Sequence, residues 1–214
     1  MTYSLRLNPG ALRPYLVSLI PVTIFDEVVL IIHLDIDGVL NRYSKIKDDI
    51  LAIAHPHNPG TFCKKNLDAF KKFLSDLDEP YTIYINSTWM YYHSEEVIRE
   101  AFVKNGFDGS KIFMGVKVPA KSASQLARMR QNQPYAKVWT IDNFIKANPE
   151  LKERIISLDD IRLWKAHRNY FKDTLNRVEY FQTNPNIGFD EIVAEQILTK
   201  KLESGRNLKA RKYP

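Results

Sequence analysis

Short apolar runs alternate with amphipathic segments along the chain. Residues 28–34 form a β-branched-rich run that predicts a strand buried on both faces. The same reasoning predicts further strands at residues 81–85, 111–116, 154–158 and 177–182. Between the first two runs, apolar residues recur at spacings that place them on one face of a helix: Leu67, Phe70, Leu74 and Leu77. Alternating strands and helices predict a three-layer, Rossmann-like α/β sandwich around a central, mainly parallel sheet.

Other helices are predicted from their ends and their apolar positions. Ser94 is a suitable N-cap for a helix that ends before Gly106. A helix from about Thr140 to Ala147 precedes the fourth strand, and a closing helix is expected from Glu191 to Leu202. In the closing helix, four residues are expected to face inward: Ile192, Val193, Ile197 and Leu198.

The charge of the chain is concentrated near its end. The 214 residues carry 31 Lys and Arg against 25 Asp and Glu, a formal net charge of +6. Most of the excess lies in residues 199–214, so the charge is weak evidence about a substrate and bears instead on contact with an anionic membrane or a further domain. We expect an extension packed on the core at residues 1–27, one domain at 28–202 and a basic, mobile tail or linker at 203–214.

Cysteine content and the N-terminal sequence indicate a compartment. Cys63 is the single cysteine, so an intramolecular disulfide is excluded and a reducing compartment, such as the cytoplasm, fits best. Residues 15–25 have the length of a signal-peptide core, but they lack a small-residue cleavage site and are too short to span a bilayer. We therefore expect neither a signal peptide nor a transmembrane helix. Delivery into another cell is compatible with the same features.

The strongest chemical signal lies directly after the first strand. Asp35 and Asp37 stand two residues apart where that apolar run ends, and Gly38 permits a tight turn. Two carboxylates at this spacing can converge on one metal ion or one phosphorus atom. In a parallel sheet such chemistry collects at the carboxyl ends of the strands.

These residues resemble motif I of the haloacid dehalogenase (HAD) superfamily, an apolar strand followed by Asp-x-Asp-Gly. Motif II of that family is a strand ending in Ser or Thr, and residues 82–88 offer Ser87, with Thr88 as the alternative. The run Ser87-Thr88-Trp89 is similar to the Ser-Ser-Trp of small HAD domains in RNA-repair proteins. The resemblance, which extends to HAD protein phosphatases, covers residues 28 to 202 and implies a HAD-like fold.

The two later motifs can be filled as well. Asp159 and Asp160 follow the fourth strand and match the acidic pair of motif IV. Lys137 stands 22 residues before Asp159 and fits the motif III lysine. Two other lysines are weaker candidates for that position: Lys121 and Lys146. Residues 182–189 also look like the loop that follows motif IV in these small domains.

The resemblance implies a mechanism and a metal. Asp35 would be the nucleophile that forms an aspartyl-phosphate, and Asp37 would be the general acid and base. Asp159 and Asp160, with an Asp35 oxygen and the backbone carbonyl of Asp37, would hold Mg²⁺.

The same resemblance assigns the phosphate-binding residues. Ser87 or Thr88, together with Lys137, would bind the phosphoryl oxygens. The histidines are interpreted as core or solvated residues rather than as catalysts or metal ligands: His33, His55 and His57. A HAD-like fold that binds a partner without catalysis is the alternative to an enzyme.

The spacing of the motifs bears on the substrate. About 50 residues separate motif I from motif II, and as many separate motif II from motif III. Predicted helices and strands use most of them, which leaves no room for a large cap domain. An open site favours a phosphorylated macromolecule. If the aromatic run at residues 89–92 lines the entrance of the active site, it favours phosphotyrosine protein over a nucleic-acid end as the substrate. The other interpretation places these residues in the core or on ordinary surface.

Overall fold

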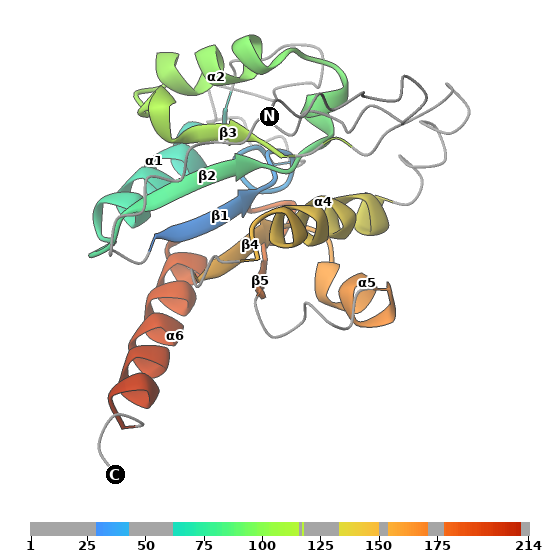
Figure 1. The fold of residues 1–214 in the computed structure, drawn as a ribbon. Helices are drawn as coiled ribbons and strands as arrows, with labels where there is room; N and C mark the ends of the chain where they lie inside the picture. Colours follow the sequence, from blue (N-terminus) through green and yellow to red (C-terminus); the bar gives the residue numbers. More distant parts are fainter. Residues whose placement is uncertain are drawn as a thin grey trace, which may run out of the picture.

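A five-stranded parallel sheet forms the centre of the protein (Figure 1). The computed structural model describes residues 29–42, 62–115, 117, 133–149, 154–170 and 178–210. The strand order is β3-β2-β1-β4-β5, and every neighbouring pair is parallel. The strands are β1 (Leu30–Leu34), β2 (Tyr81–Ile85), β3 (Ile112–Met114), β4 (Ile155–Asp159) and β5 (Val178–Gln182). The predicted α/β class and all five predicted strands are confirmed.

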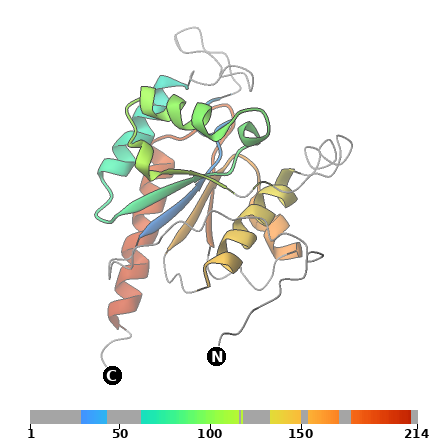
Figure 2. The ribbon, with the colours of Figure 1, turned by 45° about the horizontal axis from the view of Figure 1, so that its top comes forward.

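Helices cover both faces of the sheet, which makes the three predicted layers. Figure 2 shows one group of helices on one side of the strands and a second group on the other. The first group is α1 (Lys64–Ser75), α2 (Glu95–Lys104) and α6 (Glu191–Ala210). The second group is α4 (Gln133–Ala147) and α5 (Leu163–Tyr170). Two short 3₁₀ turns complete the described elements: η1 (Thr88–Tyr91) and η2 (Gly109–Lys111).

Strand β1 divides its side chains between two apolar cores. Leu30, Ile32 and Leu34 enter the larger core, which α1, α2 and α6 close. Ile31 belongs to the smaller core under α4 and α5. All five residues of β1 are buried, as expected for a central parallel strand with helices on both faces.

The helix predictions are correct in type and less accurate in extent. Ser94 caps α2 as expected, since its side chain accepts a hydrogen bond from the Val97 amide at 3.4 Å. Helix α4 begins seven residues before the predicted start, because Pro134 is tolerated in a first helical turn. Helix α5 was not predicted.

Helix α6 runs to Ala210 instead of Leu202, because Gly205 weakens a helix without ending it. Val193 and Ile197 are buried as predicted. The inward placement of Ile192 is wrong, since its side chain is 65% exposed. Adjacent helical positions point about 100° apart, so Ile192 faces away from the core when Val193 faces it.

Several expectations fall on residues outside the described ranges. These are the extension at 1–27, the end of the tail at 211–214, and three side chains: His55, His57 and Lys121. Within the described ranges there is no cap domain. None of the helices found there combines the length and the apolar character needed to cross a bilayer.

Candidate active site

Two carboxylates meet at the carboxyl edge of the sheet because their strands are neighbours. Asp35 follows the last residue of β1, and Asp159 is the last residue of β4. Leu34 is in register with Leu158, and the Asp35 amide donates to the Leu158 carbonyl at 2.9 Å. The two side chains are 3% and 2% exposed. Residues 124 positions apart in sequence therefore share one buried edge.

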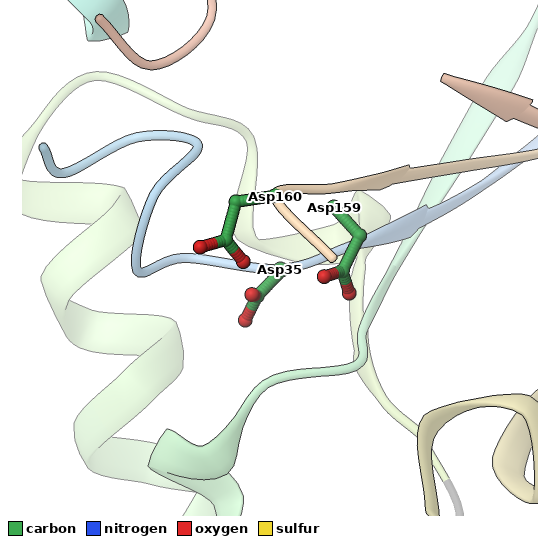
Figure 3. Close-up of side chains that lie close together, drawn as sticks. All are labelled: Asp35, Asp159 and Asp160. Carbon is green, nitrogen blue, oxygen red and sulfur yellow. The ribbon is translucent and has the colours of Figure 1, made fainter. Parts of the chain in front are cut away.

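A third carboxylate completes the cluster. One carboxylate oxygen from each of Asp35, Asp159 and Asp160 lies within 4.8 Å of the others. Figure 3 shows the three side chains together at the ends of β1 and β4. In the described part of the chain, this is the one group of three such residues able to hold a metal ion.

Lys137 reaches the cluster from the first turns of α4. Its Nζ lies 2.5 Å from an Asp35 oxygen and 2.8 Å from an Asp159 oxygen, and the residue is 6% exposed. The Asn86 side chain at the end of β2 donates to the Lys137 carbonyl at 3.1 Å. Burial alone lowers the pKa of Lys137, but attraction to Asp159 and Asp35 outweighs it and raises that pKa. The lysine is therefore held as a cation between two acids.

The carboxyl groups of the cluster outnumber its single lysine. Burial raises the pKa of Asp159, and the Asp35 carboxylate adds to this against the pull of Lys137. The pKa of Asp160 is raised by the same two causes, burial first and Asp35 second. Three crowded carboxylates are an all-oxygen donor set of the kind that Mg²⁺ prefers. The residues present therefore fit the ion that the motifs imply.

Asp37 lies outside this group of three and has its own partners. The Trp89 indole N–H donates to one carboxylate oxygen at 3.0 Å, and the Asn41 amide lies 3.4 Å from the other. Burial, and then repulsion from Asp35, raises the pKa of Asp37 to about 6. A carboxyl group with that pKa can give and take a proton near neutral pH.

Gly38 allows the loop after β1 to pass against the cluster. Its φ is 79°, and a Cβ added there would lie 2.5 Å from the Asp160 Cγ. Thr183 fixes the same loop, since its hydroxyl donates to the Gly38 carbonyl at 2.7 Å. The Thr183 amide also donates to the Asp159 carbonyl at 2.9 Å. Thr183 therefore joins the two acidic segments, a role that its sequence position did not reveal.

The loop at residues 183–189 is held from a second side. The Asn66 side-chain amide donates to the carbonyls of Ile187 and Phe189 at 2.6 and 2.7 Å. The Phe189 amide donates to the Val39 carbonyl at 2.7 Å. The loop that resembled the one after motif IV thus packs against the loop of motif I. Asn66 was missed because a single polar residue in α1 carries no distinctive sequence signal.

The comparison with protein families agrees with this arrangement. Residues 31–194 match the model of the HAD domain in Swiss Army Knife RNA repair proteins, which is more than half of the chain. The chain belongs to this family. It therefore has a HAD-type phosphatase fold, and the membership supports a phosphoesterase-type hydrolase. No curated protein and no solved structure matches the chain.

Within this HAD domain, the remaining motif residues lie as follows. Ser87 is buried after β2, and its hydroxyl accepts a hydrogen bond from the Trp89 amide at 3.4 Å. Thr88 is partly exposed and begins η1. Lys146 pairs with Asp142 at 2.6 Å and is a surface side chain. Helix α4 therefore brings Lys137, and not Lys146, to the carboxylates.

The aromatic run after motif II is divided between core and surface. Trp89 and Met90 are 0% and 2% exposed, and the Trp89 ring stacks on Phe62 at a centroid distance of 5.9 Å. Neither residue can stack on a substrate ring. Tyr91 is partly exposed and Tyr92 is 37% exposed. The interpretation that the whole run lines the entrance is therefore wrong for its first two members.

His33 is a core residue, as its place in β1 predicts, but it is not hydrogen-bonded. The ring lies between Tyr84 and Phe144, at centroid distances of 5.7 and 5.2 Å. Neither ring nitrogen has a hydrogen-bond partner in the described structure. Burial lowers the pKa of His33 to about 3, so the imidazole is neutral at physiological pH.

Proposed function

We propose that this HAD domain is a Mg²⁺-dependent phosphatase that removes a terminal phosphate from nucleic acid through an aspartyl-phosphate. The observation that supports this most strongly is the placement of Asp35. Its carboxylate is buried at the end of the central strand, paired with Lys137 and close to Asp159 and Asp160. Asp37, held by Trp89, stands two residues further on.

In the first step, an Asp35 carboxylate oxygen attacks phosphorus and the phosphorus–oxygen bond of the ester breaks. The leaving oxygen takes the proton of the Asp37 carboxyl group, whose raised pKa keeps that proton available near neutral pH. The products of this step are the dephosphorylated alcohol and an acyl phosphate on Asp35. Trp89 orients the Asp37 carboxyl group through its indole N–H.

In the second step, the Asp37 carboxylate takes a proton from a water molecule, and the oxygen of that water attacks phosphorus. The bond to Asp35 breaks, inorganic phosphate leaves and Asp37 is protonated again. Lys137 keeps the Asp35 carboxylate in place and balances its charge in both steps. Ser87 and Thr88, at the end of β2, are the proposed hydrogen-bond donors to the phosphoryl oxygens.

The carboxylates of Asp35, Asp159 and Asp160, with the Asp37 carbonyl, are the proposed Mg²⁺ ligands. The ion, when bound, would neutralise the carboxylates and the phosphoryl group so that two anions can approach. The closeness of the three carboxylates supports this assignment, because one lysine faces three acids and repulsion from Asp35 adds to burial in raising the pKa values of Asp159 and Asp160.

Nucleic acid is the proposed substrate class because the family is described from RNA repair proteins. Phosphotyrosine protein was favoured by the aromatic run, and two of its four members are buried. That preference stays a prediction, and the same assay tests it. A macromolecule suits the site, since no cap domain is found among the described residues.

The test uses five substrates at matched concentration: p-nitrophenyl phosphate, a phosphotyrosine peptide, a phosphoserine peptide, and two oligonucleotides, one phosphorylated at the 5′ end and one at the 3′ end. We expect hydrolysis that needs Mg²⁺ and stops with a chelator. Asp35→Asn should lower kcat/KM by about 10³ or more, which corresponds to about 4 kcal/mol. Asp68→Asn, which changes an exposed carboxylate in α1, is the control and should keep full activity.

Two outcomes would overturn the proposal. Retained activity in Asp35→Asn would exclude Asp35 as the nucleophile. A kcat/KM for the phosphotyrosine peptide tenfold above that for the oligonucleotides would indicate that the substrate is a phosphorylated protein. Acid-quenched enzyme should carry phosphate that hydroxylamine releases, as expected of an acyl phosphate, and Asp35→Asn should carry none.

A further inference from the structure

Helix α5 begins beside the carboxylate cluster and is strongly basic. The Ile161 amide donates to an Asp159 oxygen at 2.9 Å, which fixes the turn into the helix. Residues 161–170 contain Arg162, Lys165 and Arg168 and no acidic residue. All three basic side chains are exposed. Positive charge therefore collects directly after the proposed Mg²⁺ ligands.

The same helix exposes a tryptophan. Trp164 is 47% exposed, although tryptophan is usually well buried in folded proteins. Leu163 and Ala166 are buried on the side that faces the smaller core. Trp164 and Arg168 are four residues apart and so share the outward face of the helix. Packing of the inner side thus holds an aromatic ring and basic groups toward solvent.

The charges on α5 are arranged differently from most of those on α1 and α2. In α1 and α2, four of the six basic residues form an ion pair with an acid four residues away, as in Lys72–Asp76 and Lys104–Glu100. Within the described ranges, Arg162, Lys165 and Arg168 form no ion pair. Among the described residues, therefore, no acid offsets this positive charge, which suits an external anion.

We propose that the outward face of α5, formed by Trp164, Lys165 and Arg168 together with Arg162 just before the helix, binds the nucleotides next to the terminal phosphate. A base would stack on the Trp164 indole, and the basic side chains would contact backbone phosphates. Trp164 follows Asp160 by four residues, so its Cα lies at most about 14 Å away. A strand with its end in the site can therefore reach this face.

This inference rests on the proposed function, because it places the phosphate end of the strand at Asp35. Nucleic acid is the occupant that uses both features of the face, since each nucleotide offers a flat base and an anionic phosphate. An acidic peptide would pair with the basic side chains but would offer no flat ring to stack on the Trp164 indole. The phosphopeptide therefore serves as the rival substrate in the test.

The test compares Trp164→Ala and Arg168→Ala with the control Lys104→Ala, which removes one positive charge from α2. For each variant, kcat/KM is measured for a phosphotyrosine peptide, for p-nitrophenyl phosphate and for a phosphorylated oligonucleotide, and the oligonucleotide value is divided by the p-nitrophenyl phosphate value. We expect Trp164→Ala to lower this ratio about tenfold, in the range of one lost base stack. Trp164→Phe should restore most of it, and Lys104→Ala should leave it at the wild-type value.

A binding measurement separates the inference from the proposed function. Asp35→Asn is titrated with the phosphorylated oligonucleotide and followed by fluorescence anisotropy, with and without Trp164→Ala. Arg168→Ala should also lower the salt dependence of binding, by about 0.7 in the slope of log K against log salt. Weaker binding in Trp164→Ala supports the inference even if the wild-type protein hydrolyses no substrate, a result that would overturn only the proposed function.

Two results would overturn the inference and leave the phosphatase intact. In the first, the wild-type protein hydrolyses both the oligonucleotide and p-nitrophenyl phosphate, and Trp164→Ala changes neither the ratio of their kcat/KM values nor the binding of the oligonucleotide. The other is a loss confined to the phosphotyrosine peptide, which would assign the face to protein. Circular dichroism spectra of the variants should match wild type, as expected for changes at exposed positions.

Discussion

Each edge of the sheet holds one basic side chain between two carboxylates, yet the two arrangements differ in what they do. At the carboxyl edge, Lys137 pairs with Asp35 and Asp159. At the amino edge, Arg154 lies 3.0 Å from Glu179 and 3.9 Å from Glu79. The Lys137 group is buried and the Arg154 group is mostly shielded from water, so the shielding of an ion pair does not by itself mark a functional site.

The difference lies in what surrounds each pair. Arg154 also donates to the Ile197 carbonyl of α6 at 3.3 Å and thereby ties β4, β5 and α6 together. Lys137 instead faces a third carboxylate, Asp160, and the pKa values of the acids around it are raised. Uncompensated charge, rather than the ion pair, distinguishes a site that would bind a cation from a structural link.

Removing each cation is expected to give the largest contrast. Lys137→Met should lower kcat/KM by about 10³ and, without Mg²⁺, should cost about 3–5 kcal/mol of unfolding free energy, because two buried carboxylates lose their partner. Arg154→Met should cost about 1–3 kcal/mol and keep kcat/KM within about twofold. Steady-state kinetics and urea unfolding measure the two effects. A loss of activity in Arg154→Met as large as in Lys137→Met would contradict the assignment of Lys137 to the active site and of Arg154 to a structural link.

Removing one acid at each edge should change stability in opposite directions. The folded pKa of Asp37 is about 6, above the usual aspartate value of 3.8, so the stability that its carboxyl group contributes is fully present below pH 3.8 and is lost as the pH rises through 6. In a chelating buffer at pH 7, Asp37→Asn should therefore be up to about 3 kcal/mol more stable than wild type. This advantage should vanish near pH 4.

The matching change at the amino edge is Glu179→Gln. It should destabilise the protein by about 1 kcal/mol at pH 7, because Arg154 loses a charged partner. Urea unfolding at pH 4 and pH 7 tests both variants. Equal destabilisation by both at pH 7 would contradict the proposed excess of negative charge at the carboxyl edge.

Alanine variants of two glycines with similar backbone angles distinguish the effect of backbone strain from the effect of a changed site geometry. Gly38 and Gly106 have φ values of 79° and 84°. Alanine should cost about 1–2 kcal/mol at either position, because an L-residue is strained there. A Cβ at Gly38 would meet the Asp160 carboxyl group, whereas at Gly106 the nearest atom is the Lys71 Nζ at 3.4 Å. Gly38→Ala alone should raise the Mg²⁺ concentration for half-maximal activity, by about tenfold. A similar rise in Gly106→Ala would contradict this.

The smallest expected effect concerns Trp89. Trp89→Phe removes the hydrogen bond to Asp37, which is proposed to donate the proton to the leaving group. Hydrolysis of an alkyl phosphate, a poor leaving group, should fall about tenfold, and hydrolysis of p-nitrophenyl phosphate should fall less than about threefold. Phe102→Leu, in the same core, should affect the two substrates equally. An equal loss for both substrates in Trp89→Phe would give Trp89 a purely structural role.

Local sequence patterns were sufficient for the strands and for the identity of the acidic residues. The apolar run of β1 and the short run of β4 predict their own positions, and parallel pairing predicts that Asp35 and Asp159 share an edge. Helix α5 was not predicted because its eight residues make only about two turns, too short a segment for a clear helical period. The exposed basic face of α5 is therefore visible only in the folded structure.

The sequence by itself determined the alternation of strands and helices, and so the edge at which Asp35, Asp37, Asp159 and Asp160 gather. Only the tertiary structure decided which lysine and which aromatic residue join them. Lys137 and Asp35 are 102 residues apart, and Trp89 and Asp37 are 52 apart. Hydrophobic periodicity is a local property, whereas the partner of a buried polar group depends on how distant elements pack together.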